Sequence, residues 1–83
     1  MNGCLIILRS VTYAQRAKRV LERNGISAYV IKPEAHLVGN GCGFAVKVSD
    51  VYLAESLDIL SGENFGIMKV YVPSENGYRE LRV

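Results

Sequence analysis

The amino-acid sequence predicts a single α+β domain in which short apolar strands alternate with two amphipathic helices. The chain has 83 residues, a length that normally forms one domain. Apolar runs rich in β-branched residues recur along it, and two stretches between them carry apolar residues at helical spacing. The expected element order is β-α-β-β-α-β, which is that of the ferredoxin-like split motif.

The first half of the chain is expected to form a strand, a helix and a second strand. Residues 4–9 and residues 26–31 are short apolar runs typical of buried strands. The segment between them, residues 11–24, is predicted to be a helix for which Ser10 or Thr12 offers the N-cap. The narrow core-facing stripe of this helix consists of Ala14, Ala17, Val20 and Leu21.

The second half is expected to form a strand, a helix and one or two further strands. Residues 44–49 alternate between apolar and small or polar side chains, and Asp50 can cap a helix over residues 51–61. Residues 67–72 form the fourth strand, and residues 78–83 can add a short fifth one. The inward side chains of the second helix are expected to be Leu53, Ala54, Leu57 and Leu60. Connection rules then favour one antiparallel sheet of order 4-1-3-2 with both helices on one face.

Composition excludes several classes of protein. Ten basic and eight acidic residues give a net charge of +2, which is too small for a histone-like binder of nucleic acid. No apolar run approaches the ~20 residues of a membrane span, and the apolar N-terminus is too short for a signal peptide. Two cysteines are too few for a disulfide scaffold or a four-thiolate zinc site. We therefore expect a cytoplasmic protein with free thiols and no metal.

The two cysteines are expected to lie at opposite ends of the sheet. Because the first and third strands run antiparallel, Cys4 pairs toward Ser49 and Cys42 lies near Ser10. Six residues of strand separate them by roughly 20 Å, whereas a disulfide needs Cα atoms within about 7 Å. An internal disulfide is thus excluded on this topology, and Cys4 is expected to be a small buried residue of the core.

Cys42 lies between Gly41 and Gly43 in a long glycine-rich connection, residues 33–43. Flanking glycines leave a sulfur accessible and free backbone N–H groups to face an anion. The N-terminus of the first helix, with hydroxyl donors from Ser10 and Thr12, would lower the pKa of a nearby thiol. The alternative is that the glycines merely connect two strands and that Cys42 has no chemical role.

Two further features have a functional and a purely structural interpretation. His36, in the same connection, can be a base for the Cys42 thiol or an ordinary surface histidine. Arg16, Arg19 and Arg23 share the solvent face of the first helix at spacings of three and four. They form either a solvated face or a surface that docks an acidic protein or contacts phosphate.

The sheet face away from the helices is expected to be rich in apolar and aromatic side chains. Candidates for it are Leu5, Ile7, Ala45, Tyr29 and Tyr71. A homodimer or the C-terminal segment would cover such a face. This leaves open a non-catalytic domain that uses the face for assembly or ligand binding. RNA binding of the RRM type fits less well, because the first strand has no aromatic residue to stack on bases.

The layout resembles the DUF3343 family, described as selenium/sulfur carrier-like proteins. The resemblance covers about residues 4–72 and rests on five matching stretches: Ser10-x-Thr12 with Ala14, Asn24-Gly25-Ile26, Pro33, Gly41-Cys42-Gly43, and the strand over 44–48. It implies that Cys42 holds sulfur or selenium as a persulfide or selenosulfide, with no cofactor. It also implies a protein partner, such as a cysteine desulfurase or a selenium- or sulfur-using enzyme, and no enzymatic turnover of its own.

Overall fold

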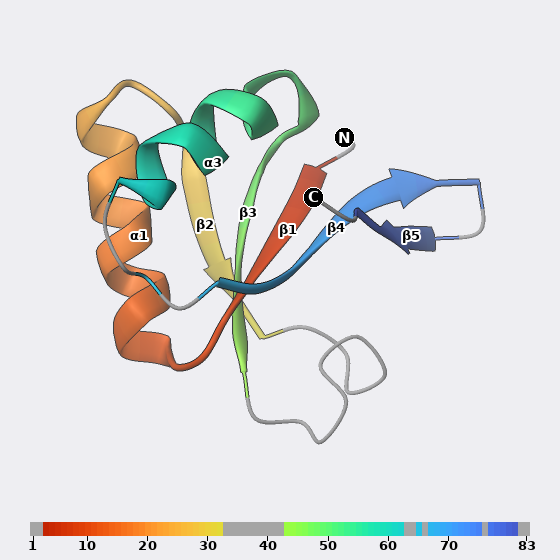
Figure 1. Ribbon diagram of the computed structural model, residues 1–83, viewed down its shortest axis with the longest axis horizontal. Helices are drawn as coiled ribbons and strands as arrows, with labels where there is room; N and C mark the ends of the chain where they lie inside the picture. Colours follow the sequence, from red (N-terminus) through yellow and green to blue (C-terminus); the bar gives the residue numbers. More distant parts are fainter. Residues whose placement is uncertain (1–2, 33–42, 63–64, 66, 76, 82–83) are drawn as a thin grey trace.

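The computed structural model describes residues 3–32, 43–62, 65, 67–75 and 77–81 of the chain. These residues form five strands, two α-helices and a single 3-10 turn, in the order of Figure 1. The elements are β1 (Gly3–Leu8), α1 (Val11–Arg23), β2 (Ala28–Ile31), β3 (Phe44–Ser49), the 3-10 turn η1 (Asp50–Tyr52), α3 (Leu53–Ser61), β4 (Ile67–Ser74) and β5 (Gly77–Glu80). Neither helix is long and apolar enough to cross a bilayer, as far as the described residues go.

The strands form one antiparallel sheet of order β2-β3-β1-β4-β5. The four-strand order 4-1-3-2 that the sequence predicts is not the observed one. Read from the β5 edge, the order is 5-4-1-3-2, so the difference is the added strand. Gly77, with φ of 117°, adopts a backbone conformation that few other residues tolerate, and this lets β5 turn back along β4. The fifth strand is thereby confirmed over Gly77–Glu80, within the expected residues 78–83 except at its start.

Both helices cover the same face of the sheet (Figure 1). The side chains of β1 alternate between two apolar clusters, as the period of a strand requires. Cys4, Ile6 and Leu8 pack with the buried stripes of α1 and α3, whereas Leu5 and Ile7 point to the other face. The main core therefore lies between the sheet and the helices, and β1 has side chains in both layers.

The first helix begins and ends on local signals. Ser10, not Thr12, is the N-cap: its extended backbone turns the Oγ atom to accept a hydrogen bond from the Tyr13 N–H at 3.4 Å. At the other end Gly25 has a φ of 83°, and the Ile26 N–H donates to the Leu21 carbonyl at 2.9 Å. This is a Schellman termination, and it delays the start of β2 until Ala28.

The second helix differs from the expected one at its start. Asp50 does not cap it; the chain first makes η1, and α3 follows with Tyr52 at the N-cap position and no side-chain cap. The buried positions of α3 are Leu53, Ser56 and Leu60, while Ala54 is exposed. Ser56 is buried at little cost because its hydroxyl donates to the Tyr52 carbonyl at 2.7 Å.

Candidate functional site

The predicted site residues divide into two groups. Cys42, Gly41 and His36 lie outside the described residues, so their predicted roles stay predictions. The remaining predicted residues lie inside the described ranges: Ser10, Thr12, Gly43, Arg16, Arg19 and Arg23. The described part of the candidate site is therefore the end of the sheet at which Gly43 leads into β3.

The chain that carries Cys42 enters the sheet through Gly43 at the end where β1 stops. Gly43 is buried and precedes Phe44, which pairs with Leu8, the last residue of β1. Leu8 also pairs with Ile67 of β4, next to a shift in register after Ile7. Since Ser10 follows Leu8 by two residues, the helix cap and the entry into β3 share one end of the sheet.

This end of the molecule favours negative charge. The first turn of α1 contains no acidic residue that would neutralise the positive end of the helix dipole. Ser10 accepts one backbone N–H with its Oγ atom, and its own hydroxyl proton is left to donate. Thr12 is exposed in the same turn. A thiolate placed at this end would be stabilised by these groups, and the pKa of its thiol would be lowered.

Phe65 closes the same end from the turn after α3. Its ring is buried, and the Arg16 guanidinium carbon lies 5.7 Å from the ring centre. This distance is within the range of a cation–π contact. The contact places Phe65 beside α1. No local sequence pattern marks Phe65 as a neighbour of the first helix, so this contact cannot be predicted from the sequence alone.

Cys4 lies at the opposite end of β1 in a sealed position. It pairs with Val48, is 1% exposed and belongs to the core between the sheet and the helices. Burial raises the pKa of the Cys4 thiol, and the negative charge of Asp50 raises it further. The prediction that Cys4 is a small buried residue of the core is confirmed, and both burial and Asp50 favour its protonated thiol.

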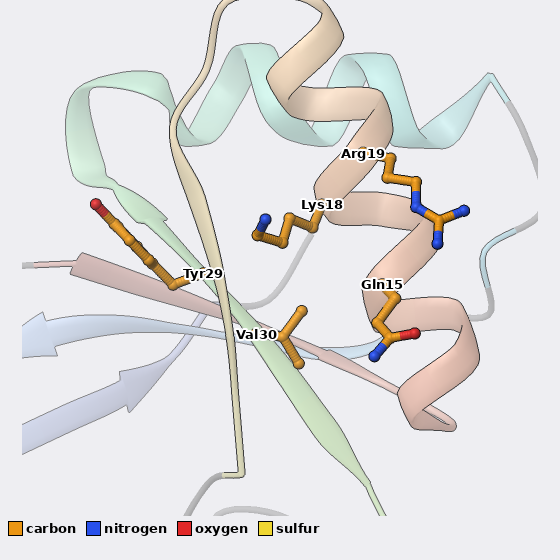
Figure 2. Close-up of a pocket in the computed structure, with 5 residues that line it drawn as sticks. All are labelled: Gln15, Lys18, Arg19, Tyr29 and Val30. Carbon is orange, nitrogen blue, oxygen red and sulfur yellow. The ribbon is translucent and has the colours of Figure 1, made fainter.

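The three arginines of α1 are all exposed, as expected, but their surroundings differ. Arg16 lies on Phe65, and Arg23 is in the last turn of the helix. Arg19 lines a hollow of about 490 Å³ between α1 and β2, together with Gln15, Lys18, Tyr29 and Val30 (Figure 2). Arg19 therefore faces a concave surface formed by described residues of α1 and β2.

The sheet face away from the helices is closed at its centre. Of the five expected occupants of this face, Leu5, Ile7, Ala45 and Tyr71 are buried in the single chain, whereas Tyr29 is 63% exposed. The expectation of an open apolar face is wrong at the centre of the sheet. These side chains form one cluster there, against which Ile31 packs, and the cluster is removed from water within the chain. The C-terminal strand does not cross the face: β5 extends the sheet, and Leu81 packs on the helix side.

The described strands do not present a row of exposed aromatic side chains on which RNA bases could stack. Phe44 packs against the core on the helix side, and β1 has no aromatic residue. The exposed Tyr29 lies on the edge strand rather than on a central one. In the part of the chain that the structure describes, no three His, Cys, Asp or Glu side chains are grouped as metal ligands.

Comparison with families of known proteins gives a match over most of the chain. The model of the family described as "Putative Se/S carrier protein-like" matches residues 3–72 of the chain. Searches of curated proteins and of solved structures found no match, so the ferredoxin-like assignment stays a prediction. The matched range spans the sheet from β1 into β4, both helices and the Cys42 segment. The chain belongs to this family of Se/S carrier-like proteins.

Proposed function

We propose that this protein carries sulfur or selenium on Cys42 and delivers it to a partner protein. The observation that supports this proposal most directly is the burial of the second thiol of the chain, that of Cys4. The sequence has two cysteines, and Cys4 is sealed in the core with its pKa raised. A member of a Se/S carrier-like family that holds its cargo on a cysteine must then use Cys42.

The transfer step needs only a thiolate. The Cys42 sulfur attacks the outer sulfur of a donor persulfide, R–S–SH. The new S–S bond joins Cys42 to that outer sulfur, the donor S–S bond breaks, and the donor leaves as the thiolate R–S⁻. Charge and electrons balance without an added oxidant, as in thiol–disulfide exchange. Delivery repeats the step with an acceptor nucleophile, and Cys42 is released as a thiolate.

The end of the sheet around Gly43 supports this chemistry. The positive end of the α1 dipole, which no acidic residue of the first turn neutralises, and the Ser10 hydroxyl favour both the attacking thiolate and the released one. We assign Ser10, Thr12, Gly41 and Gly43 as supporting residues and His36 as a base for the thiol. Cargo with selenium in place of the outer sulfur forms a selenosulfide by the same step.

The donor in this proposal is a cysteine desulfurase in the cytoplasm, and the acceptor is an enzyme that uses selenium or sulfur. The exposed arginines Arg16, Arg19 and Arg23 give α1 a basic surface for such a protein. No catalytic turnover is assigned to the chain itself.

Intact-mass analysis tests the proposal. The wild type, Cys42→Ser and Cys4→Ala proteins are each incubated with a cysteine desulfurase and cysteine, and then with selenocysteine in place of cysteine. We expect a gain of one sulfur or selenium atom in the wild type and in Cys4→Ala, and none in Cys42→Ser. A gain that persists in Cys42→Ser would overturn the proposal.

A further inference from the structure

The strand β2 is an edge of the sheet and has properties of a binding surface. It pairs with β3 on one side only, and the other side has no partner among the described strands. Tyr29, in the middle of this strand, is 63% exposed. An edge of this kind presents unpaired backbone N–H and C=O groups that can hydrogen-bond an added strand.

Hollows flank the edge on both faces of the sheet. On the helix side, Gln15, Lys18 and Arg19 line the hollow beside β2; Figure 2 shows Val30 pointing toward α1 and Tyr29 pointing away from it. A second hollow of about 760 Å³ includes Gly3, Tyr29, Ile31 and Lys47. A Cβ atom at Gly3 would lie 2.6 Å from Lys47 Cε, so the lysine stem passes directly over Gly3.

The two hollows differ in chemistry. The helix side is polar and basic: Lys18 already pairs with Glu22 at 3.2 Å, while Arg19 makes no ion pair within the described residues. The outer side is lined by the Tyr29 ring, Ile31 and the aliphatic stem of Lys47. An added strand places alternate side chains on opposite faces. One face of such a strand would then meet cations and the other would meet apolar surface.

We propose that β2 docks an extended segment of a partner protein in which acidic and apolar residues alternate. The segment adds to the sheet as a sixth strand beside β2. Its acidic side chains point toward Lys18 and Arg19, and its apolar ones toward Tyr29 and Ile31. A second copy of this chain is a poorer occupant, because pairing β2 with β2 would bring the basic side chains of both copies together.

The docking direction is useful to a carrier but does not depend on one. Ile31, the last residue of β2, pairs with Ala45, two residues after Gly43. A segment paired along β2 would thus run toward the end of the sheet where the Cys42 segment enters. The binding surface itself contains no cysteine, so it is independent of the proposed cargo chemistry.

Nuclear magnetic resonance with a defined peptide tests the inference. The probe is an acetylated and amidated peptide of three Glu-Val repeats, added to millimolar concentration to the ¹⁵N-labelled full chain. We expect saturable shifts and slowed amide exchange at residues 28–31, and none at residues 77–80 on the opposite edge. The same peptide with Gln in place of Glu should bind at least about fivefold more weakly, because it loses the charge contacts.

Charge reversal on the protein separates this edge from general basicity. Arg19→Glu should weaken binding of the Glu-Val peptide at least about fivefold, whereas Arg79→Glu on β5 has the same charge change and should leave binding unchanged. Cys42→Ser should bind as the wild type does, so a failed carrier function would not affect this result. Absent shifts at residues 28–31, equal binding by Arg19→Glu, or a β2-mediated dimer without peptide would each overturn the inference.

Discussion

The two ends of β1 offer a thiol opposite surroundings. At one end Cys4 is buried under the helices, pairs with Val48 and has its pKa raised by burial and by Asp50. At the other end the strand stops at Leu8, Ser10 opens a helix with no acid in its first turn, and Gly43 admits the Cys42 segment. Within one small domain the first end suppresses the thiolate and the second favours it.

The difference shows how a carrier with two cysteines can avoid cross-reaction. A second thiolate that attacked the inner sulfur of a cargo persulfide would form a disulfide and expel the outer sulfur as hydrosulfide, and attack on the outer sulfur would move the cargo to that second thiol. Val48, the partner of Cys4, is five residue steps along the chain from Gly43, which is roughly 16 Å of strand. Separation and burial of Cys4 together keep that competing thiol away from the cargo end.

Alkylation rates give the largest expected contrast between the two ends. In the folded protein at neutral pH, Cys42 should react with iodoacetamide at least about a thousandfold faster than Cys4, because Cys4 reacts only after opening of the core. Quenched labelling followed by peptide mass analysis measures both rates. In denaturant the ratio should fall to near one; equal rates in the folded state would contradict the account.

A cavity in the core should weaken the seal around Cys4. Ile6 is fully buried at the centre of β1, between Val46 and Val70. Ile6→Ala should lower the free energy of unfolding by about 2–5 kcal/mol and speed labelling of Cys4. Val51→Ala, at a position 77% exposed, is the matched control and should cost less than about 0.5 kcal/mol. Urea denaturation checks both; similar costs would show that β1 is not the core strand.

The raised pKa of Cys4 predicts a loss of stability at alkaline pH. The folded state holds the thiol proton more tightly than the unfolded state, so stability is unaffected by this group below about pH 8.5. As pH rises above the unfolded-state pKa toward the raised folded-state pKa, the free energy of unfolding should fall by up to about 1.4 kcal/mol per pH unit.

Cys4→Ala lacks this ionisation and provides the control for the alkaline effect. Unfolding by urea between pH 7 and pH 10 should show a gap between wild type and Cys4→Ala that is constant at first and then changes in favour of the variant. A gap that stays constant over the whole range would mean that Cys4 ionises equally in both states.

The smallest expected effect concerns the cap at the cargo end. Ser10→Ala removes the acceptor of the Tyr13 N–H and should cost about 1 kcal/mol. Thr12→Ala, in the exposed first turn, should cost less than about 0.5 kcal/mol. If persulfide loading slows in Ser10→Ala but not in Thr12→Ala, the hydroxyl has a role beyond the cap; equal stabilities would contradict the assignment of Ser10 as N-cap.

Much of the fold could be predicted because the apolar periods are clear. The alternation in β1 and β3 separates the two faces of the sheet correctly, and the stripe of Ala14, Ala17 and Leu21 is the buried side of α1. These elements obey local rules in which strand and helix periods differ. Local patterns were therefore enough to predict a helix or strand wherever that element buries one of its faces.

The errors arise where tertiary contacts override a local signal. Asp50 is a residue type that often caps helices, but the chain forms a 3-10 turn at this position. Ser56 is polar and yet buried, because its hydroxyl donates a hydrogen bond to the Tyr52 carbonyl, while the apolar Ala54 faces solvent. The burial of Leu5 and Ile7 on the second face likewise depends on how the whole chain packs.

The sequence predicts which residues lie at each end of the sheet. It does not predict the hollow or the side-chain contact on the surface of α1. The antiparallel register already placed Ser10 beside the entry to β3 and Cys4 far from it, and the structure agrees for the described residues. The hollow beside β2 and the Arg16–Phe65 contact could not be foreseen, because both depend on how α1 crosses distant segments. Their residues carry no local motif.

Mapping of the sulfane sulfur tests the central claim most directly. Wild-type protein is loaded by a cysteine desulfurase with cysteine, alkylated, digested and analysed by tandem mass spectrometry. We expect the additional sulfur on the peptide that contains Cys42 and no additional sulfur on the peptide that contains Cys4. An additional sulfur on Cys4, or none on either peptide when the desulfurase is active, would contradict it.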